Sequence, residues 1–216
     1  MTLRDVLVFL MATSVAWDSA FAGPSALGGV LQASRARLNT GPVSAGATIY
    51  DGDRFSTEKG GVLLLRGEAV MLELAEESNA VMRRKANGAE GMETELTRGT
   101  LVLNTARASA LEVIVREAHV QPASDARTVA QLSVTGPKEL SIYARRGTLR
   151  LSYKWQTEMI AEGAAYRVIL DPPDDNPNKT KPAGQPTKAF ALIVISAALV
   201  PLIIVLHEVF ESADRP

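Results

Sequence analysis

The sequence predicts an all-β fold, a β sandwich or a short β solenoid, followed by a proline-rich stalk and one C-terminal transmembrane helix. Three observations predict this. Between residues 29 and 170, apolar residues alternate with polar ones in short runs that end at glycine and polar turns. Residues 171–188 contain five prolines and no large apolar side chain. Residues 189–206 form an uncharged, almost entirely apolar run.

The composition argues against most enzyme classes. Among 216 residues, 23 Lys and Arg balance 24 Asp and Glu, so bulk charge gives no reason to expect a nucleic-acid partner. The chain has no cysteine, which excludes disulfides, a thiolate nucleophile and cysteine-ligated metals. Only two histidines, His119 and His207, are available for imidazole chemistry. We therefore assign no catalytic, cofactor-binding or metal-ligating residue, and we expect no cofactor.

Residues 1–22 are expected to be a cleavable signal peptide. Arg4 precedes an apolar run over residues 6–17, and Ala20 and Ala22 form the small-x-small pattern that signal peptidase cuts. A helix of that run would extend only about 18 Å, which is short for a bilayer core of about 30 Å. An uncleaved anchor and an ordinary buried helix are the alternatives.

Alternation predicts the strands of the main domain, residues 23–170. The expected strands are 30–38, 47–50, 53–56, 61–65, 69–74, 80–84, 93–97, 100–104, 112–118, 128–135, 139–144, 148–153, 157–160 and 165–170. So many short strands must close on themselves, because one open sheet would expose apolar faces. Arg-Gly pairs at Arg66, Arg98 and Arg146 each precede an alternating run, which predicts three hairpin turns at the glycines.

The C-terminal part is predicted to attach the domain to a membrane. Residues 171–188 could hold the domain up to about 55 Å from a bilayer as an extended stalk. The run 189–206 would extend about 27 Å as a helix, enough for one crossing, and residues 207–216 form a short polar tail. A buried helix or strand pair is the alternative. Asn178 begins a glycosylation sequon that chance explains equally well.

Two topology signals disagree. Lys179, Lys181 and Lys188 precede the apolar run, and the tail after it is mainly acidic, so the positive-inside rule would place the domain in the cytoplasm. The export signal places it outside, and we give that signal more weight because a translocating N-terminus commits the rest of the chain. The expected location is the inner membrane, with one span and the β domain in the periplasm.

Several segments resemble the FecR-type domain. They are residues 46–57 (GATIYDGDRFST) with 62–65 (VLLL), 72–78 (LELAEES), 96–102 (LTRGTLV), 146–149 (RGTL) and 161–166 (AEGAAY). The resemblance covers roughly residues 29–170 and implies a periplasmic β domain for sensing and protein contact. FecR-type iron-citrate regulators also carry an anti-sigma segment and a span before this domain. This chain departs from that pattern, so we do not expect it to control a sigma factor directly.

Acidic pairs in the domain do not predict a site. Asp51 and Asp53 flank a glycine, but position 12 of a calcium loop would be Val62, so they are expected to form a turn. Glu93 and Glu95 share one strand face and are expected to be solvated there, because no sugar-binding cluster accompanies them.

A histidine and a tryptophan are the remaining candidates for a functional role. His119 could be a base only if a nucleophile and an acid converge on it, with Glu117 as the nearest acid on its face. Trp155, beside Lys154, could stack on a glycan, although alternation more readily puts one of the aromatic positions that flank Lys154 in the core.

The predicted function is that of a non-catalytic, membrane-anchored envelope protein. The charge of residues 23–188, 21 Lys and Arg against 19 Asp and Glu, is about +2 and selects no charged ligand. The expected partner is another envelope protein, bound by addition of its strand to an exposed edge; no small-molecule ligand is indicated. A cell-wall or glycan-binding module is the alternative, and an enzyme that depends on His119 is the third possibility.

Overall fold

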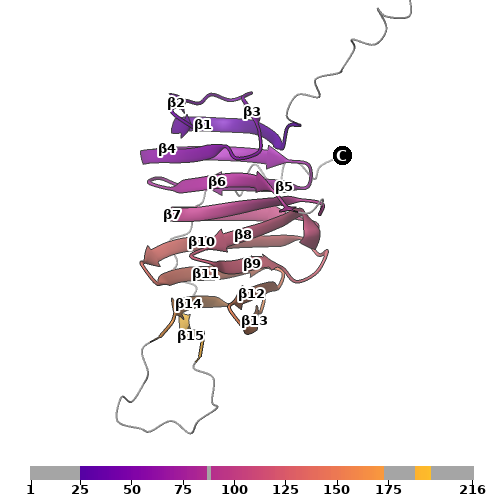
Figure 1. The fold of residues 1–216 in the computed structure, drawn as a ribbon, viewed down its shortest axis with the longest axis vertical. Coiled ribbons are helices and arrows are strands. Elements are labelled where there is room, and N and C mark those ends of the chain that lie inside the picture. The colour runs from indigo at the N-terminus through magenta and orange to yellow at the C-terminus, as the bar shows by residue number, and fades with distance from the viewer. Residues whose placement is uncertain (1–24, 87–88, 173–187, 196–216) are drawn as a thin grey trace, which may run out of the picture.

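The computed structural model describes residues 25–86, 89–172 and 188–195, and the strands among them confirm the all-β prediction. All of these strands belong to one hydrogen-bonded sheet (Figure 1). They are β1 (Gly28–Leu38), β2 (Gly41–Pro42), β3 (Thr48–Ile49), β4 (Arg54–Gly67), β5 (Val70–Leu74), β6 (Asn79–Arg84), β7 (Met92–Thr105), β8 (Leu111–Val115), β9 (Ala118–Pro122), β10 (Thr128–Gly136), β11 (Glu139–Arg146), β12 (Leu149–Tyr153), β13 (Gln156–Ile160), β14 (Ala165–Leu170) and β15 (Phe190–Ile195), with one short 3-10 helix, η3 (Ala108–Ala110).

Two long strands bend, and their bends fold the sheet into two facing layers. Residues 54–56 of β4 pair with β6, whereas residues 63–66 pair with β5. Residues 92–98 of β7 pair with β6, whereas residues 99–105 pair with β5 and β10. The second halves of β4 and β7, with β5, β10, β11, β14 and β15, form what we call the first layer. The first halves, with β6, β8, β9, β12 and β13, form the second layer.

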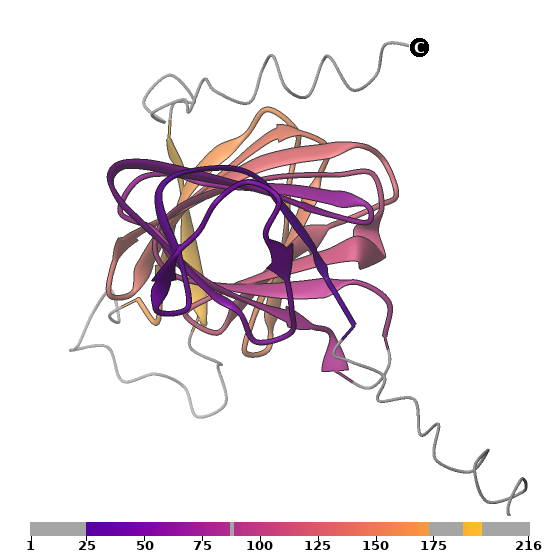
Figure 2. The same ribbon diagram turned by 90° about the horizontal axis from the view of Figure 1, so that it is seen from above.

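The layers enclose one apolar core. Viewed along the stack, the strands surround a central space (Figure 2), and buried side chains from both layers fill it. The first layer contributes Leu65 and Leu103, and the second contributes Val113, Val120 and Leu151. Among the described residues, β7 and β8 are the one parallel pair, and every other pairing is antiparallel. The arrangement is thus closer to a sandwich than to a solenoid of parallel coils.

A buried polar corner holds the chain where it passes between layers. Ser78, fully buried between β5 and β6, accepts a hydrogen bond at Oγ from the Thr100 N–H (2.9 Å), and its own N–H donates to Thr57 Oγ1 (2.9 Å). Gly99 lies against Ser78 with φ +84°, a conformation that favours glycine. Since each of these polar groups has a partner, the corner can be buried without a large cost.

The three predicted Arg-Gly hairpins had different outcomes. The first is confirmed, because β4 ends at Gly67 and pairs with β5 directly after it. The other two predictions are wrong. Gly99 lies inside β7 at its bend, and Gly147 (φ +74°) connects β11 to β12, which belong to different layers. Both glycines adopt positive φ. There the chain passes from one layer to the other and does not form a hairpin between two paired strands.

Alternation located most strands, and its errors fall at bends and tight turns. The predicted pairs 53–56 with 61–65 and 93–97 with 100–104 are single bent strands, β4 and β7. The predicted strand 112–118 is instead the end of one strand and the start of another, because Arg116 and Glu117 adopt positive φ in a turn between β8 and β9.

The predicted transmembrane helix over residues 189–206 is wrong as bounded. Residues 190–195 form β15, which pairs antiparallel with β14 from Leu170↔Phe190 to Ala165↔Ile195. The apolar residues 196–206 lie outside the described residues, and as a helix they would extend only about 17 Å, about half of a bilayer core. Within the described ranges, none of the helices has the length and apolarity to cross a bilayer.

The predicted stalk is also wrong, because residues 171–188 connect two paired strands. The Asp171 N–H donates to the Ala189 carbonyl at 2.8 Å, so the segment leaves the sheet and returns to the same place. A loop whose ends are held together cannot space the domain from a bilayer. Residues 173–187, including the sequon at Asn178, lie outside the described residues, as do the predicted signal peptide 1–22 and tail 207–216.

Candidate functional site

Two edge strands of the sheet, β13 and β15, lie at the same end of the stack, opposite to β1 (Figure 1). They come from opposite layers, and each has a hydrogen-bonded neighbour on one side only among the described strands. A side chain bridges them, because Gln156 Oε1 accepts from the N–H groups of Ala189 (3.1 Å) and Phe190 (3.4 Å). We call this end of the molecule the open end.

The free edge of β15 presents the main-chain groups of Leu192 and Val194. On β14, the Leu170 N–H donates toward the β11 side, to the Lys138 carbonyl, whereas the Asp171 N–H donates to Ala189. Since main-chain groups alternate in an antiparallel pair, Ala191, Ile193 and Ile195 face β14. The residues between them therefore direct their N–H and C=O groups away from the sheet, as the contact from Phe190 to Gln156 also indicates.

Exposed apolar side chains gather at the open end. Of the six large apolar side chains that the structure describes as exposed, four lie here: Trp155 (63%), Met159 (54%), Ile193 (45%) and Val194 (73%). β15 contains no charged residue and no proline. Edge strands usually carry such residues because they prevent pairing with other chains, so β15 is an unprotected edge.

A charged cluster fixes the loop ends beside this edge. Asp171 accepts hydrogen bonds from Tyr153 OH (3.1 Å) and from Lys154 Nζ. The bond to Asp171 raises the pKa of Lys154, and the same bond lowers the pKa of Asp171. Burial, followed by the bond to Asp171, raises the pKa of Tyr153. The expectation that one aromatic position beside Lys154 lies in the core is confirmed, since Tyr153 is buried and Trp155 is exposed.

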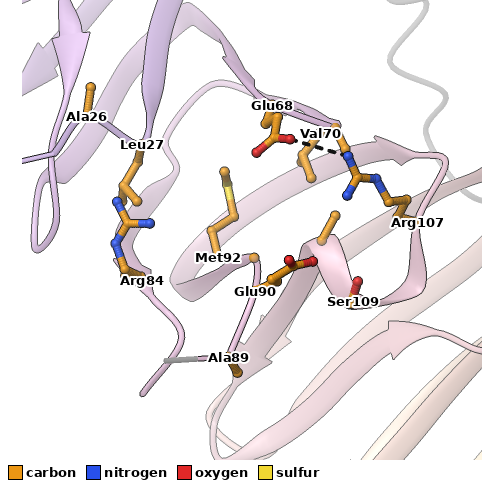
Figure 3. Close-up of a pocket in the computed structure, with 13 residues that line it drawn as sticks. Ala26, Leu27, Glu68, Val70, Arg84, Ala89, Glu90, Met92, Arg107 and Ser109 are labelled. Atoms are coloured by element: carbon orange, nitrogen blue, oxygen red, sulfur yellow. Dashed lines mark hydrogen bonds and ion pairs between the residues drawn. The ribbon is translucent and has the colours of Figure 1, made fainter. Parts of the chain in front are cut away.

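A cavity of about 360 Å³ lies at the rim, where the start of β1, the β4–β5 turn, the β6–β7 loop and η3 meet (Figure 3). Met92 forms part of its apolar wall, and Arg107 pairs with Glu68 at 3.3 Å. Arg84, another lining residue, donates to Ser25 Oγ (2.8 Å). Its described lining carries Arg84 and Arg107 beside Glu68 and Glu90, so the charges around the cavity are mixed.

The acidic pairs behave as turn and surface residues. Asp53 Oδ2 accepts from the Tyr50 N–H (2.7 Å) within the expected turn, whereas Asp51 Oδ1 accepts from the Arg84 N–H (2.7 Å) and joins the turn to the end of β6. Glu95 forms an ion pair with Arg83 (2.9 Å). In the part of the chain that the structure describes, no cluster of three or more His, Asp or Glu residues could hold a metal ion.

His119 pairs with a different acid from the one the sequence indicated. Its Nδ1 lies 2.7 Å from Glu112 Oε1 on the neighbouring strand β8, whereas Glu117 lies in the turn. Strand parity misidentified the acid because it assumed one continuous strand through the turn. His119 is half-exposed, and among the described residues no nucleophile is hydrogen-bonded to it, so the pair lacks the third member of a catalytic grouping.

Sequence reasoning missed two features, Glu73 and β15. Glu73 lies between Leu72 and Leu74, so alternation puts it on the outer face, where a carboxylate is ordinarily solvated. It is instead 1% exposed, and burial raises its pKa to about 7. β15 was hidden inside an apolar run without alternation, a pattern that a buried strand and a membrane helix share.

Comparison with known proteins assigns no family. No protein-family model and no curated protein matches the chain. Two crystal structures of a candidate anti-sigma factor from Parabacteroides distasonis are similar to it, with TM-scores of 0.43 and 0.44 and 14% sequence identity. In both, the match covers 54% of this chain and 54% of that chain, so the similarity spans about half the length of each. The resemblance to FecR-type domains stays a prediction.

Proposed function

We propose that this chain is a non-catalytic binding domain of the cell envelope, which engages another protein by adding a partner strand to the free edge of β15. The observation that carries the proposal is the unprotected edge itself: an apolar terminal strand with Ile193 and Val194 exposed. Main-chain hydrogen bonds to Leu192 and Val194 would supply affinity, and contacts with neighbouring side chains would supply selectivity.

The proposed compartment rests on the sequence of residues 1–22, which has the pattern of an export signal. The FecR-type resemblance supports the same compartment and a role in sensing. Protease digestion of intact spheroplasts tests it. We expect the β domain to be digested from outside and the mature chain to begin at Gly23. A domain that resists digestion until the cells are lysed would place it in the cytoplasm instead.

Photo-crosslinking in intact cells tests the binding mode. A photoreactive residue in place of Ile193 is expected to give a discrete adduct with one envelope protein. Val194→Pro in the same chain removes the free N–H that a partner strand would use, and we expect at least a tenfold loss of the adduct. Val194→Thr keeps both the N–H and the β-branched shape, so this matched control should retain the adduct.

Two results would overturn the binding mode. Absence of any discrete adduct would leave the edge without a partner. An adduct that Val194→Pro does not weaken would mean that the partner binds elsewhere at the open end.

A cell-wall glycan is the second candidate ligand, and the exposed indole of Trp155 favours it. Aromatic faces stack on sugar rings, and Trp155 stands in the turn between β12 and β13. Sedimentation with purified peptidoglycan separates the two candidates. Glycan binding predicts co-sedimentation that Trp155→Ala abolishes and Val194→Pro leaves unchanged.

A further inference from the structure

A line of side chains crosses the outer face of the first layer, the face directed away from the core. Residues next to them in sequence, such as Leu63, Leu72 and Leu103, belong to the core, so these side chains point the opposite way. The strand register places them side by side, and we call them the outer row: Leu64, Glu73, Val102, Gln131, Tyr143, Ala165 and Ile195.

The middle of the outer row is buried. Leu64, Glu73, Val102 and Gln131 are each between 1% and 6% exposed, although Leu64 and Val102 lie outside the core cluster. On the outside of a two-layer fold, such side chains contact water unless a third layer covers them. β1, with β2 and β3 beside it, continues the sheet beyond β4, the other described strands belong to the two layers, and η3 lies beside β9 and β7, so no described element forms that cover.

The chemistry of the row suits an apolar cover. Leu64 and Val102 flank Glu73 on the two neighbouring strands. Glu73 Oε1 has no hydrogen-bond partner among the described residues, and its carboxyl has a pKa raised by burial to about 7, so it is close to half neutral at physiological pH. An apolar segment covers such a strip at less cost than a charged one, which would leave more groups desolvated.

The chain itself supplies such a segment. Residues 196–216 come directly after Ile195, the last member of the outer row, and residues 196–206 are uncharged and apolar except for Ser196. From β15 across β14, β11, β10, β7 and β5 to β4 there are six strand spacings, about 29 Å in total. As an extended chain, the eleven apolar residues 196–206 span about 36 Å and reach β4, whereas as a helix they span about 17 Å and end short of β7.

We infer that residues 196–216 fold back from β15 across the outer row and form a third layer of this domain. An apolar run that resembles a membrane anchor by composition would then have an intramolecular role. The inference does not depend on the proposed partner, because it concerns the face of the first layer and not the edge of β15.

Thiol labelling tests the inference, since the chain has no cysteine and each introduced thiol is unique. Val102→Cys reports on the outer row. Leu103→Cys, the next residue on β7, reports on the core, and Arg150→Cys reports on exposed surface of the second layer. Labelling rates are measured in the full chain, in a chain that ends after Ile195, and in a full-length chain with Leu202, Ile203 and Ile204 each replaced by Asp.

In the full chain we expect the thiol at position 102 to react at least tenfold more slowly than the thiol at position 150. Truncation and the triple aspartate change should each accelerate labelling at position 102 at least tenfold, and leave positions 103 and 150 unchanged. Labelling at position 102 that neither change accelerates would overturn the inference.

Disulfide formation in the intact chain gives a second test that needs no destabilising change. Val102→Cys is combined in turn with a cysteine in place of Val200, Ile203, Leu206 or Val209. We expect at least one pair to oxidise within a single chain. Disulfides that join two chains would mean that a second copy covers the row, and no disulfide with any pair would remove the segment from this face; either result overturns the inference.

Discussion

Glu73 combines a buried position with a group that ordinarily needs water. Burial raises its pKa from 4.5 to about 7, so the folded chain holds a proton that the unfolded chain releases. Between these two pKa values the unfolded state binds fewer protons, and stability therefore falls as pH rises. Below pH 4.5 the carboxyl is protonated in both states, so burying it does not lower the free energy of unfolding through its charge. Above pH 7 the full loss is present.

Glu73→Gln should remove this pH dependence. The free energy of unfolding of the variant, relative to the parent chain, should rise by about 3 kcal/mol between pH 4.5 and pH 7.5. Urea titrations of both chains at several pH values measure it. A difference between variant and parent that does not change with pH would contradict the account of Glu73.

Gly99 is the residue on which the bend of β7 depends. It has φ +84°, and a Cβ there would lie 2.2 Å from Ser78 Oγ in the buried corner. Gly99→Ala should lower the free energy of unfolding by about 2–4 kcal/mol, measured by chemical denaturation. Gly41→Ala is the matched control, because open space surrounds its Cβ position, and it should cost less than about 0.5 kcal/mol. Equal costs for the two would contradict the corner's role.

β15 shows why the C-terminal prediction failed. Its sequence, FALIVI, lacks the alternation that identified the other strands, because one face packs on the core and the other leads into the outer row. Length and hydrophobicity then favoured a membrane helix. Residues 190–195 form a strand because the main-chain N–H and C=O groups at the edge of β14 need hydrogen-bond partners. No pattern in the sequence shows that β14 has such an edge.

Proline substitution tests the register of β15 in one pair of variants. The Ile193 N–H faces β14, so Ile193→Pro should break a ladder bond and cost about 3 kcal/mol or more. The Val194 N–H faces the free edge, so Val194→Pro should cost less than about 1 kcal/mol. Thermal denaturation compares the two. A larger loss for Val194→Pro would mean that the opposite residues form the edge.

The molecule as a whole was predictable where local pattern determines structure. The all-β class, the hairpin after Arg66 and the turn at Asp51 and Asp53 all follow from alternation and turn chemistry, and the structure confirms them. The two layers do not follow from local pattern, because β4 and β7 continue through their bends and share their halves between layers. The candidate site at the open end depends on this long-range arrangement. The sequence could therefore predict that some strand edge is exposed, but not that this edge belongs to β15.

The loop between β14 and β15 is part of the same arrangement. Because its ends meet at a 2.8 Å hydrogen bond, replacing residues 173–187 with a short Gly-Asn turn should leave the melting temperature within about 4 °C of the parent. Circular dichroism at rising temperature measures it. A large loss of stability would mean that these residues contribute packing to the domain, beyond connecting two strands.

Residue-resolved amide hydrogen exchange over β15 tests the central claim most directly. A strand paired on one side only predicts an alternating pattern: slow exchange at Ala191, Ile193 and Ile195, and fast exchange at Leu192 and Val194. That pattern would establish both the strand and the free edge on which the proposed binding depends. Uniformly slow exchange at all five amides would contradict it, because it would indicate a helix or an edge that is already occupied.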